Sequence, residues 1–527
     1  MTDPVPVAVL QNRLNAIAEE MGEAMLRTSY SQILNSSRDF SIGLIDADAR
    51  LVAQADHIPV HVGALPWAVR AVAAAFPAPS PGDVFLLNDP YHGGSHLPDL
   101  TAFVPVMHNG ALLFWSVVRA HQSDIGGATH GGYNPGATEI YQEGLRVPPI
   151  RLTEGGVLRA DLIDLLATNV RHPRDFRGDL AAMIGAARLG EKRLAAVIAE
   201  FSAATLLDAV QAMLDGAERH ARAIVSEWRD GSYEGTALLD DDGHGAEDIA
   251  IRARVTVAGS DVTVDLTQSD PQVRGFVNSS HANMQSAVAM AFAYLLDADC
   301  PRNEGAFRPL RVIARPGTVV WAEEGAPVTL CTSHCSNEIV EAIVVALSAA
   351  CPDRAMGGWG RRFRVALEGR DPRTGRRFIW HMFQARPGGG ASVAGDGWPA
   401  AGEWHSVGGI KFGSIEVAEA RFPLHFEHHE FREHSGGGGK HRGGDGGELV
   451  LRLDTDAPVL ANTAGEGVRH GARGMLGGQD GAPHRYTLEV HGAPPRELRT
   501  KETGIVMPPG SRLHVLAGGG GGWGAPA

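Results

Sequence analysis

The sequence has few cysteines and no long run of apolar residues, and each shortage excludes a class of protein. Four cysteines in 527 residues are too few for a disulfide scaffold in a chain this long. No segment approaches the roughly 18 consecutive apolar residues that a membrane-spanning helix needs. The N-terminus lacks a basic segment followed by an apolar core, so we expect no signal peptide. These shortages predict a reduced, cytoplasmic enzyme or enzyme subunit with no membrane partner.

Positive charge and aromatic side chains are also scarce. The chain carries 47 Lys and Arg residues against 61 Asp and Glu residues, a formal net charge of -14, and no block of basic residues stands out. Aromatic residues make up only 6% of the chain. Because nucleic-acid binding depends on clustered basic residues, we expect no nucleic acid as a partner.

Glycine, in contrast, is abundant. The 66 glycines are about one residue in eight, against an average near 7%. They follow no G-X-Y period, which excludes a collagen-like fold and favours many tight turns and close backbone contacts. SGGGGKHRGG (435–444) resembles a phosphate-binding loop, but His434 and His441 stand where that motif needs Gly and Ser or Thr. We therefore expect a glycine-rich turn or interface loop there, and a flexible tail for GGGGGWG (518–524).

Residues 1–158 are predicted to form an N-terminal α/β region. Apolar residues recur with helical spacing over 6–30 and again over 63–76, whereas 41–54 has the pattern of a β-hairpin. GDVFLLNDP and LLFWSVVRAH are then expected as two buried strands. The histidines and carboxylates discussed below lie at the ends of these strands, a common location for active sites.

Two further regions are predicted after this one. Residues 159–230 are rich in Ala, Leu, Arg and Glu with helical periodicity, which indicates two long helices with Gly190 as their one weak point. Residues 231–527 read as a strand-rich α+β region, with helices expected over 281–297 and 336–350. We therefore predict a multi-domain α+β protein of mixed helices and mainly antiparallel sheets joined by glycine-rich turns.

The segment NDPYHGGSHLPDL carries the first group of residues that can bind a cation. His92 and His96 are four residues apart, but the glycines and the proline around them disfavour a continuous helix. His96 and Asp99 can instead point at one ion from a tight turn. The alternative is a loop whose histidines only cap turns.

The segment AHQSDIGG supplies the second group, His121 and Asp124, after the apolar strand over 112–118. If adjacent strands end together, His121 lies beside His96 and Asp99. Two imidazoles and a carboxylate without a thiolate suit Mn²⁺, Fe²⁺ or Zn²⁺. Such a site keeps coordination positions open for water or substrate and is catalytic in type.

Three other carboxylates are candidates for extra ligands or general bases. They are Asp39 in NSSRDFS and Glu139 and Glu143 in TEIYQEG. Asp39 could equally pair with Arg38 or cap a turn, and the glutamates could belong to a solvated face. CTSHC (331–335) has no second Cys/His pair at zinc spacing, so we interpret it as small core residues.

Beyond these residues, the sequence resembles the B subunit of the hydantoinase B/oxoprolinase family, which also contains the large subunits of acetone and acetophenone carboxylases. The resemblance extends over almost the whole chain. The segments that carry it are NSSRDFSIGLID, HIPVHVGALP, GDVFLLNDPYHGGSHLPDL, RAHQSDIGG, TEIYQEGLRVPP, PQVRGFVN, NEGAFRPL and SGGGGKHRGG.

The resemblance implies a two-subunit, ATP-dependent hydrolase of cyclic amides such as hydantoin, oxoproline or other lactams. A partner A subunit, similar to actin-like kinases, would bind ATP and phosphorylate the substrate. This chain would be the metal-bearing B subunit, holding Mn or Zn, or else Fe. The family's metal ligands fall on His96, Asp99 and His121, with Asp39 as a further ligand, and Asp124 or Glu139 could accept a proton from the attacking water.

Two alternatives stay open at this point. One is a subunit of an ATP-dependent ketone carboxylase, which bicarbonate dependence and label incorporation would distinguish. The other is a non-catalytic scaffold that stabilises the A subunit, which predicts no bound metal. The chain has no recognisable ATPase domain, so we expect it to be inactive alone, and its length favours the compact B subunit of a hydrolase.

Overall fold

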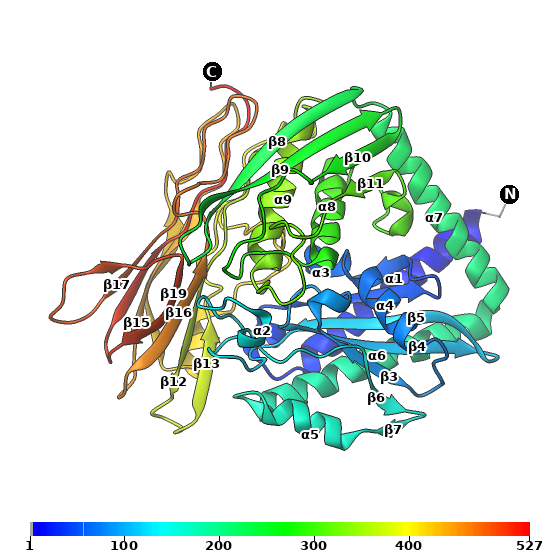
Figure 1. Ribbon diagram of the computed structural model, residues 1–527, viewed down its shortest axis with the longest axis horizontal. Coiled ribbons are helices and arrows are strands. Elements are labelled where there is room, and N and C mark those ends of the chain that lie inside the picture. Colours follow the sequence, from blue (N-terminus) through cyan, green and yellow to red (C-terminus); the bar gives the residue numbers. More distant parts are fainter. Residues whose placement is uncertain (1–3, 56, 527) are drawn as a thin grey trace.

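The structure, a computed structural model, describes residues 4–55 and 57–526 and contains four β-sheets with helices around them (Figure 1). The first 158 residues contain the predicted long helix, hairpin and second helix. Their elements are α1 (Pro4–Thr28), α2 (Gln32–Asn35), β1 (Phe40–Asp46), β2 (Leu51–Gln54), α3 (Pro59–Val62), α4 (Leu65–Ala75), β3 (Val84–Leu87), η1 (Pro90–His92), β4 (Asp99–His108), β5 (Ala111–His121), η2 (Ile140–Gln142), β6 (Ile150–Glu154) and β7 (Val157–Leu158).

These strands form one antiparallel sheet with the order β2-β1-β5-β4-β3-β6-β7. Side chains alternate between its two faces, as pleated strands require. On β4, Leu100 and Ala102 pack in the main core, whereas Phe103 packs in a smaller core with Val69 of α4. Helix α6 (Pro173–Phe201) lies against β4 and β5. Burial of both faces explains why these strands read as nearly continuous apolar runs.

The two long helices predicted over 159–230 are confirmed, but the break between them is not at Gly190. A short α5 (Ala160–Thr168) precedes α6, and α7 (Ala203–Val225) follows it after Ser202, whose φ of 71° ends the helix. Gly190 lies inside α6, where an added Cβ would be 2.2 Å from Ser116 Oγ. This glycine permits close packing of α6 on the sheet. No single helix in the described residues is long and apolar enough to cross a membrane. Helices α6 and α7 reach that length and apolarity only together, and the chain bends by 105° between them.

The remaining chain forms three more sheets, and the mainly antiparallel α+β fold is confirmed. Strands β10 and β11 pair in parallel; the other pairs are antiparallel. The sheet orders are β11-β10-β9-β8, β13-β12-β16-β19 and β14-β15-β20-β17-β18. The elements are β8 (Gly231–Asp241), β9 (Glu247–Ala258), β10 (Asp261–Asp265), α8 (His281–Leu295), η3 (Glu304–Phe307), β11 (Leu310–Ile313), η4 (Cys331–Cys335), α9 (Ser336–Leu347), β12 (Phe363–Arg370), β13 (Arg377–His381), α10 (Ile415–Arg421), β14 (Leu424–Arg432), β15 (Gly446–Leu453), β16 (Val459–Gly465), β17 (Arg485–Glu489), β18 (Arg496–Glu497), β19 (Lys501–Met507) and β20 (Arg512–Leu516).

One hydrophobic cluster runs through all three predicted regions. It includes Leu10 of α1, Val210 of α7, Val255 of β9 and Val340 of α9. The last two sheets, on the left in Figure 1, share a separate core that includes Trp380 and Leu451. The division of the chain at 158 and 230 into domains therefore stays a prediction, since the regions are joined by packing.

The glycine-rich C-terminal run is buried, so the prediction of a flexible tail is wrong. Its backbone lies against the backbones of other glycine runs: Gly520 N–H donates to Gly444 O at 2.9 Å, and Gly521 N–H donates to Gly358 O at 2.8 Å. An added Cβ on Gly388 would be 1.9 Å from Gly444 O. Only glycine allows backbones to pack this closely, as at the crowded axis of a collagen triple helix. We call residues 357–360, 388–390, 435–444, 474–481 and 518–524 the glycine bundle.

We expect Gly388→Ala to destabilise the protein by about 2–4 kcal/mol, because the new methyl group would overlap a backbone carbonyl that cannot move freely. Gly185→Ala is the matched control: it lies on the exposed face of α6 with nothing within 4 Å of the new Cβ. There, alanine should stabilise the helix by about 1 kcal/mol. Chemical denaturation of both variants measures the difference, and equal stabilities would contradict the packing described.

Candidate metal centre

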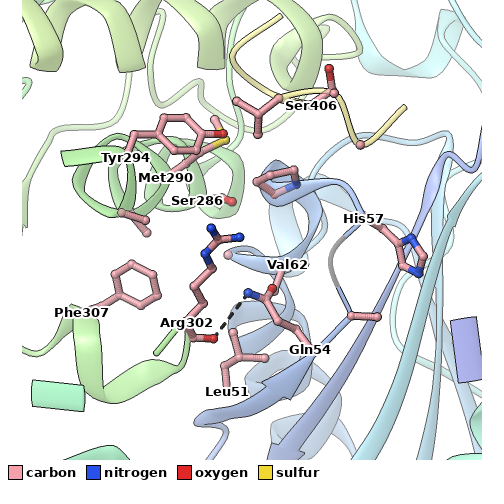
Figure 2. Close-up of a pocket in the computed structure, with 18 of the residues that line it drawn as sticks. Leu51, Gln54, His57, Val62, Ser286, Met290, Tyr294, Arg302, Phe307 and Ser406 are labelled. Carbon is pink, nitrogen blue, oxygen red and sulfur yellow. Dashed lines mark hydrogen bonds between the residues drawn. The ribbon is translucent and has the colours of Figure 1, made fainter. Parts of the chain in front are cut away.

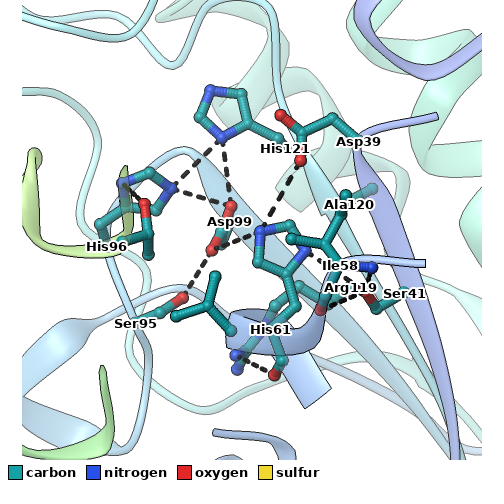
Figure 3. Close-up of polar contacts among 12 residues, drawn as sticks. Asp39, Ser41, Ile58, His61, Ser95, His96, Asp99, Arg119, Ala120 and His121 are labelled. Atoms are coloured by element: carbon teal, nitrogen blue, oxygen red, sulfur yellow. Dashed lines mark hydrogen bonds and ion pairs between the residues drawn. The ribbon is translucent and has the colours of Figure 1, made fainter. Parts of the chain in front are cut away.

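Strand pairing brings the predicted cation ligands together at the ends of three inner strands of the seven-stranded sheet. Strand β4 begins at Asp99, β5 ends at His121, and these two residues are opposite each other in the antiparallel register. Strand β1 begins directly after Asp39, and the carbonyl of Asp39 accepts the N–H of His121 at 3.0 Å. Residues from distant parts of the sequence therefore meet at the point where these strands begin and end (Figure 3).

His96, Asp99 and His121 form a triangle of ligand atoms. His96 Nε2 lies 2.9 Å from Asp99 Oδ1, His121 Nδ1 lies 3.2 Å from the same oxygen, and the two nitrogens are 3.2 Å apart. All three side chains are buried. A cation with bonds of about 2.1 Å separates neighbouring ligands by about 3.0 Å in octahedral and about 3.4 Å in tetrahedral geometry. The triangle therefore fits one cation.

Hydrogen bonds orient two of these ligands. His96 Nδ1 lies 2.6 Å from the carbonyl of Thr329, so it carries the proton and leaves the lone pair of Nε2 for the triangle. The Ser95 hydroxyl donates to Asp99 Oδ2 at 2.6 Å. Glu143 in turn accepts the Thr329 N–H at 2.9 Å and also the N–H of Val328. Glu143, a candidate ligand or base from the sequence, thus positions Thr329; its burial raises its pKa to about 7.

The charge of Asp99 also favours a bound cation. Its burial alone would raise its pKa, but the imidazoles of His61 and His96 outweigh burial and hold the pKa of Asp99 well below its usual value. Its ion-pair partners within 4 Å are histidines: His61, His96 and His121. A fully buried carboxylate is costly unless a positive charge compensates it. A divalent cation among these ligand atoms would provide that charge, so the residues fit one.

Sequence reasoning missed His61. It lies on the short helix α3, with Nε2 at 3.4 Å from Asp99 Oδ2 and 3.7 Å from Asp39 Oδ1, and Nδ1 at 3.4 Å from Ser41 Oγ. It thus connects the two carboxylates (Figure 3). Its only signal in the sequence is its place in HIPVHVGALP, a segment shared with the family but without ligand spacing.

Three of the predicted polar residues lie away from the triangle. Asp124 pairs with Arg171, accepting its Nη1 at 2.9 Å and its backbone N–H at 2.7 Å. Glu139 is exposed and caps the short helix η2 through a reciprocal bond with Gln142. His92 is half-exposed, with Nδ1 at 2.7 Å from Asp89 Oδ2. Asp39 does face the triangle, although its oxygens are not part of it.

A small pocket opens beside the triangle. Asp39, His61 and His121 belong to its lining. The other lining residues are Ile33, Tyr133, Thr332, Ser333, Arg362, Arg364, Phe383, His405 and Ile410. CTSHC is fully buried as expected, and its cysteines are free, but Thr332 and Ser333 belong to this pocket.

A larger cavity of about 470 Å³ lies next to this pocket. Residues of α3 and of the segment 405–411 contribute to the lining of both. Met290 and Tyr294 of α8 face Val62 across this cavity (Figure 2). Its lining is mainly apolar, with Arg302 and Lys411 as the cationic members. The cavity is large enough for a small organic ring, whereas the pocket beside the triangle is not.

Comparison with known sequences gives a consistent result. A model of the hydantoinase B/oxoprolinase family matches residues 3–526. The beta subunit of a caprolactamase from Pseudomonas jessenii is 35% identical over 531 residues, covering 99% of this chain and 91% of the relative. The B subunit of a putative D-/L-hydantoinase from Pseudomonas sp. (strain NS671) is 29% identical, covering 99% of this chain and 90% of the relative.

Two solved structures are also similar. The crystal structure of ATP-dependent caprolactamase from Pseudomonas jessenii has a TM-score of 0.93 at 33% identity and covers 100% of this chain and 92% of that chain. A nucleotide-free structure of acetone carboxylase has a TM-score of 0.89 at 19% identity, covering 100% of this chain and 76% of that chain. The second likeness shows the fold alone.

We expect Asp99→Asn to weaken metal binding at least about tenfold, because it removes the buried charge while keeping the shape of the side chain. His121→Ala should do the same. His92→Ala is the control, since His92 points away from the triangle and should leave the metal content unchanged. Elemental analysis of the purified proteins measures this, and a full metal complement in Asp99→Asn would argue against the site.

Proposed function

Because the chain belongs to the hydantoinase B/oxoprolinase family, we propose that it is the metal-bearing B subunit of an ATP-dependent hydrolase of cyclic amides. Its partner would be an ATP-binding, actin-like A subunit that phosphorylates the substrate. The relatives named as caprolactamase and hydantoinase subunits support the amide substrate and the partner. The triangle of His96, Asp99 and His121 is the observation that carries the proposal.

The proposed division of work follows from amide chemistry. A lactam carbonyl is a poor electrophile, and phosphorylation of its oxygen by the partner activates the carbon. Water would add to this carbon, the C–N bond would break as a proton passes to the ring nitrogen, and a second water would hydrolyse the resulting acyl phosphate to a carboxylate and inorganic phosphate. His96, Asp99 and His121 would hold a divalent cation, Mn, Zn or Fe, in a buried place that excludes bulk water, where electrostatic effects are strong. Such a cation would supply Lewis acidity, which lowers the pKa of water towards about 7 and would make it a nucleophile at neutral pH.

We assign proton acceptance to Asp39. Its carboxylate lines the pocket beside the triangle, and one of its oxygens is held near His61 Nε2 at 3.7 Å. One oxygen can complete the ligand set, as expected from the sequence, while the other accepts the proton. Asp124 and Glu139 are less suitable, since neither lines this pocket and both already serve structural contacts.

A ketone carboxylase is the second candidate, favoured by the fold shared with acetone carboxylase. The two functions differ in the fate of carbon from bicarbonate. Isotopic label from bicarbonate stays in the product of a carboxylase, whereas a hydrolase releases an unlabelled amino acid. A scaffold without catalysis is less favoured, because it gives no reason for three buried ligand atoms to converge.

The chain and an actin-like A subunit, purified together, should open cyclic amides only when ATP is present. Screening lactams, hydantoins and oxoproline by product analysis tests this. We expect Asp39→Asn to lower kcat by about a factor of 10² or more, as loss of a general base does. Glu139→Gln should retain nearly full activity, because its side chain is exposed.

The controls separate the possible failures. Asp99→Asn in the same complex should abolish ring opening while leaving the complex assembled. A metal-loaded complex that opens none of these rings with ATP would contradict the proposed reaction. A large loss of kcat in Glu139→Gln, with metal retained, would instead contradict only the assignment of the proton acceptor.

A further inference from the structure

The lining of the small pocket beside the triangle includes a buried guanidinium, that of Arg364. Among the described residues it forms no ion pair with a carboxylate. Arg364 on β12 is fully buried; its Nη2 donates to the carbonyl of Gly131 and lies 2.6 Å from His381 Nδ1. Its carbon Cζ stacks 4.0 Å from the centre of the Tyr133 ring. Among the residues that the structure describes, Nη1 of Arg364 has no hydrogen-bond partner. A buried donor left in this state is costly and indicates an absent acceptor.

The arginines near this pocket carry more positive charge than the neighbouring carboxylate balances. Arg362 lies 3.5 Å from Glu403, and Arg386 pairs with the same carboxylate. Glu403 thus supplies one negative charge to both Arg362 and Arg386, and no carboxylate among the described residues forms an ion pair with Arg364, so the three arginines exceed the charge of Glu403 by about two. His381 adds no negative charge; its burial and the nearby Arg364 hold its pKa well below the usual value, so its ring is neutral.

A third donor faces the same pocket. Nδ1 of His405 is buried and has no hydrogen-bond partner among the described residues. Burial lowers the pKa of His405 to about 3, so its ring is neutral at physiological pH. A neutral imidazole can donate one hydrogen bond without adding charge. The pocket lining thus offers guanidinium donors and an imidazole donor to the same small pocket.

The charge that the carboxylates contribute near the pocket depends on the metal. Asp39, which lines the pocket, and Asp99, which belongs to the triangle, carry two negative charges, and these can balance the surplus positive charge of the arginines only while no cation is bound. A divalent cation in the triangle neutralises both carboxylates. Farther out, Arg119 is a further buried cation, whereas Glu143, whose pKa burial raises to about 7, supplies only part of a negative charge. With the cation in place, the pocket therefore keeps an excess of about two positive charges, which a dianion would match.

We propose that Arg362, Arg364 and His405 form a phosphate-binding site beside the metal triangle, and that this site forms fully only when the cation is bound. Its ligand is a phosphate dianion, for which the pocket has to widen from its present size: first the phosphoryl group of the activated substrate, whose ring stays outside the pocket, and then the phosphate released from it. This identification of the ligand rests on the proposed function. Guanidinium forks bind phosphate oxygens in pairs, which also fixes orientation. The site would thus hold the leaving group next to the attacking water.

Binding of inorganic phosphate to the whole protein tests the site without any turnover. Isothermal titration should show binding to the metal-loaded protein, and removal of the cation with a chelator should weaken it at least about tenfold. Arg364→Gln should weaken phosphate binding to a similar extent while leaving the metal content unchanged. Arg315→Gln is the matched control, because Arg315 is exposed and does not line the pocket, and this variant should bind phosphate normally.

A second measurement needs no variant. With Mn²⁺ in the site, the ³¹P resonance of phosphate should broaden far more than with the same concentration of free Mn²⁺. Equal phosphate affinity with and without the cation, equal affinity in Arg364→Gln, or no added broadening would each overturn the site. Absent ring opening with intact phosphate binding would instead count against the proposed reaction alone.

The two sources of the phosphate are separated by kinetics. If the site holds the phosphoryl group of the activated substrate, Arg364→Lys should lower kcat. If it holds only the released phosphate, the same change should relieve product inhibition and leave kcat unchanged.

Discussion

The structure depends on one pairing in the central sheet, the antiparallel register that sets Asp99 opposite His121. This register brings a carboxylate and an imidazole together where β4 begins and β5 ends, and the turn before β4 adds His96. Removing one partner from a buried charge pair typically costs about 3–5 kcal/mol. The surroundings of Asp99 therefore have to supply positive charge permanently. A cation shared by three ligand atoms would satisfy this need and, under the proposed function, would also provide the chemistry.

The two halves of the chain supply different parts of the site. The N-terminal sheet and the turn before β4 carry the three residues of the triangle, α3 adds His61 beside them, and the loop at Thr329 fixes the ring of His96. The cationic part of the pocket lining comes from Arg362 and from Arg364 of β12, and His405 lies at the end of the segment 386–405. This segment contains Gly388 of the glycine bundle, whose backbone packing fixes its course. The abundance of glycine thus supports the position of charged residues across the pocket.

The sequence predicted the fold class, most of the long elements and the three residues of the triangle. The ligands could be found because residues at the ends of neighbouring strands converge. His61 and Arg364 could not be found this way, since one lies on a short helix and the other in a strand with no ligand spacing. Asp124 and Glu139 have suitable side chains, but contacts with Arg171 and Gln142 occupy them. The buried glycine run was read as flexible because glycine alone does not reveal its backbone partners.

The metal centre is tested most directly by X-ray diffraction from the isolated protein, with data collected on both sides of the absorption edge of its metal. We expect one anomalous peak within bonding distance of His96 Nε2, Asp99 Oδ1 and His121 Nδ1. A metal-replete protein with its peak elsewhere, or with these three side chains turned apart, would contradict it.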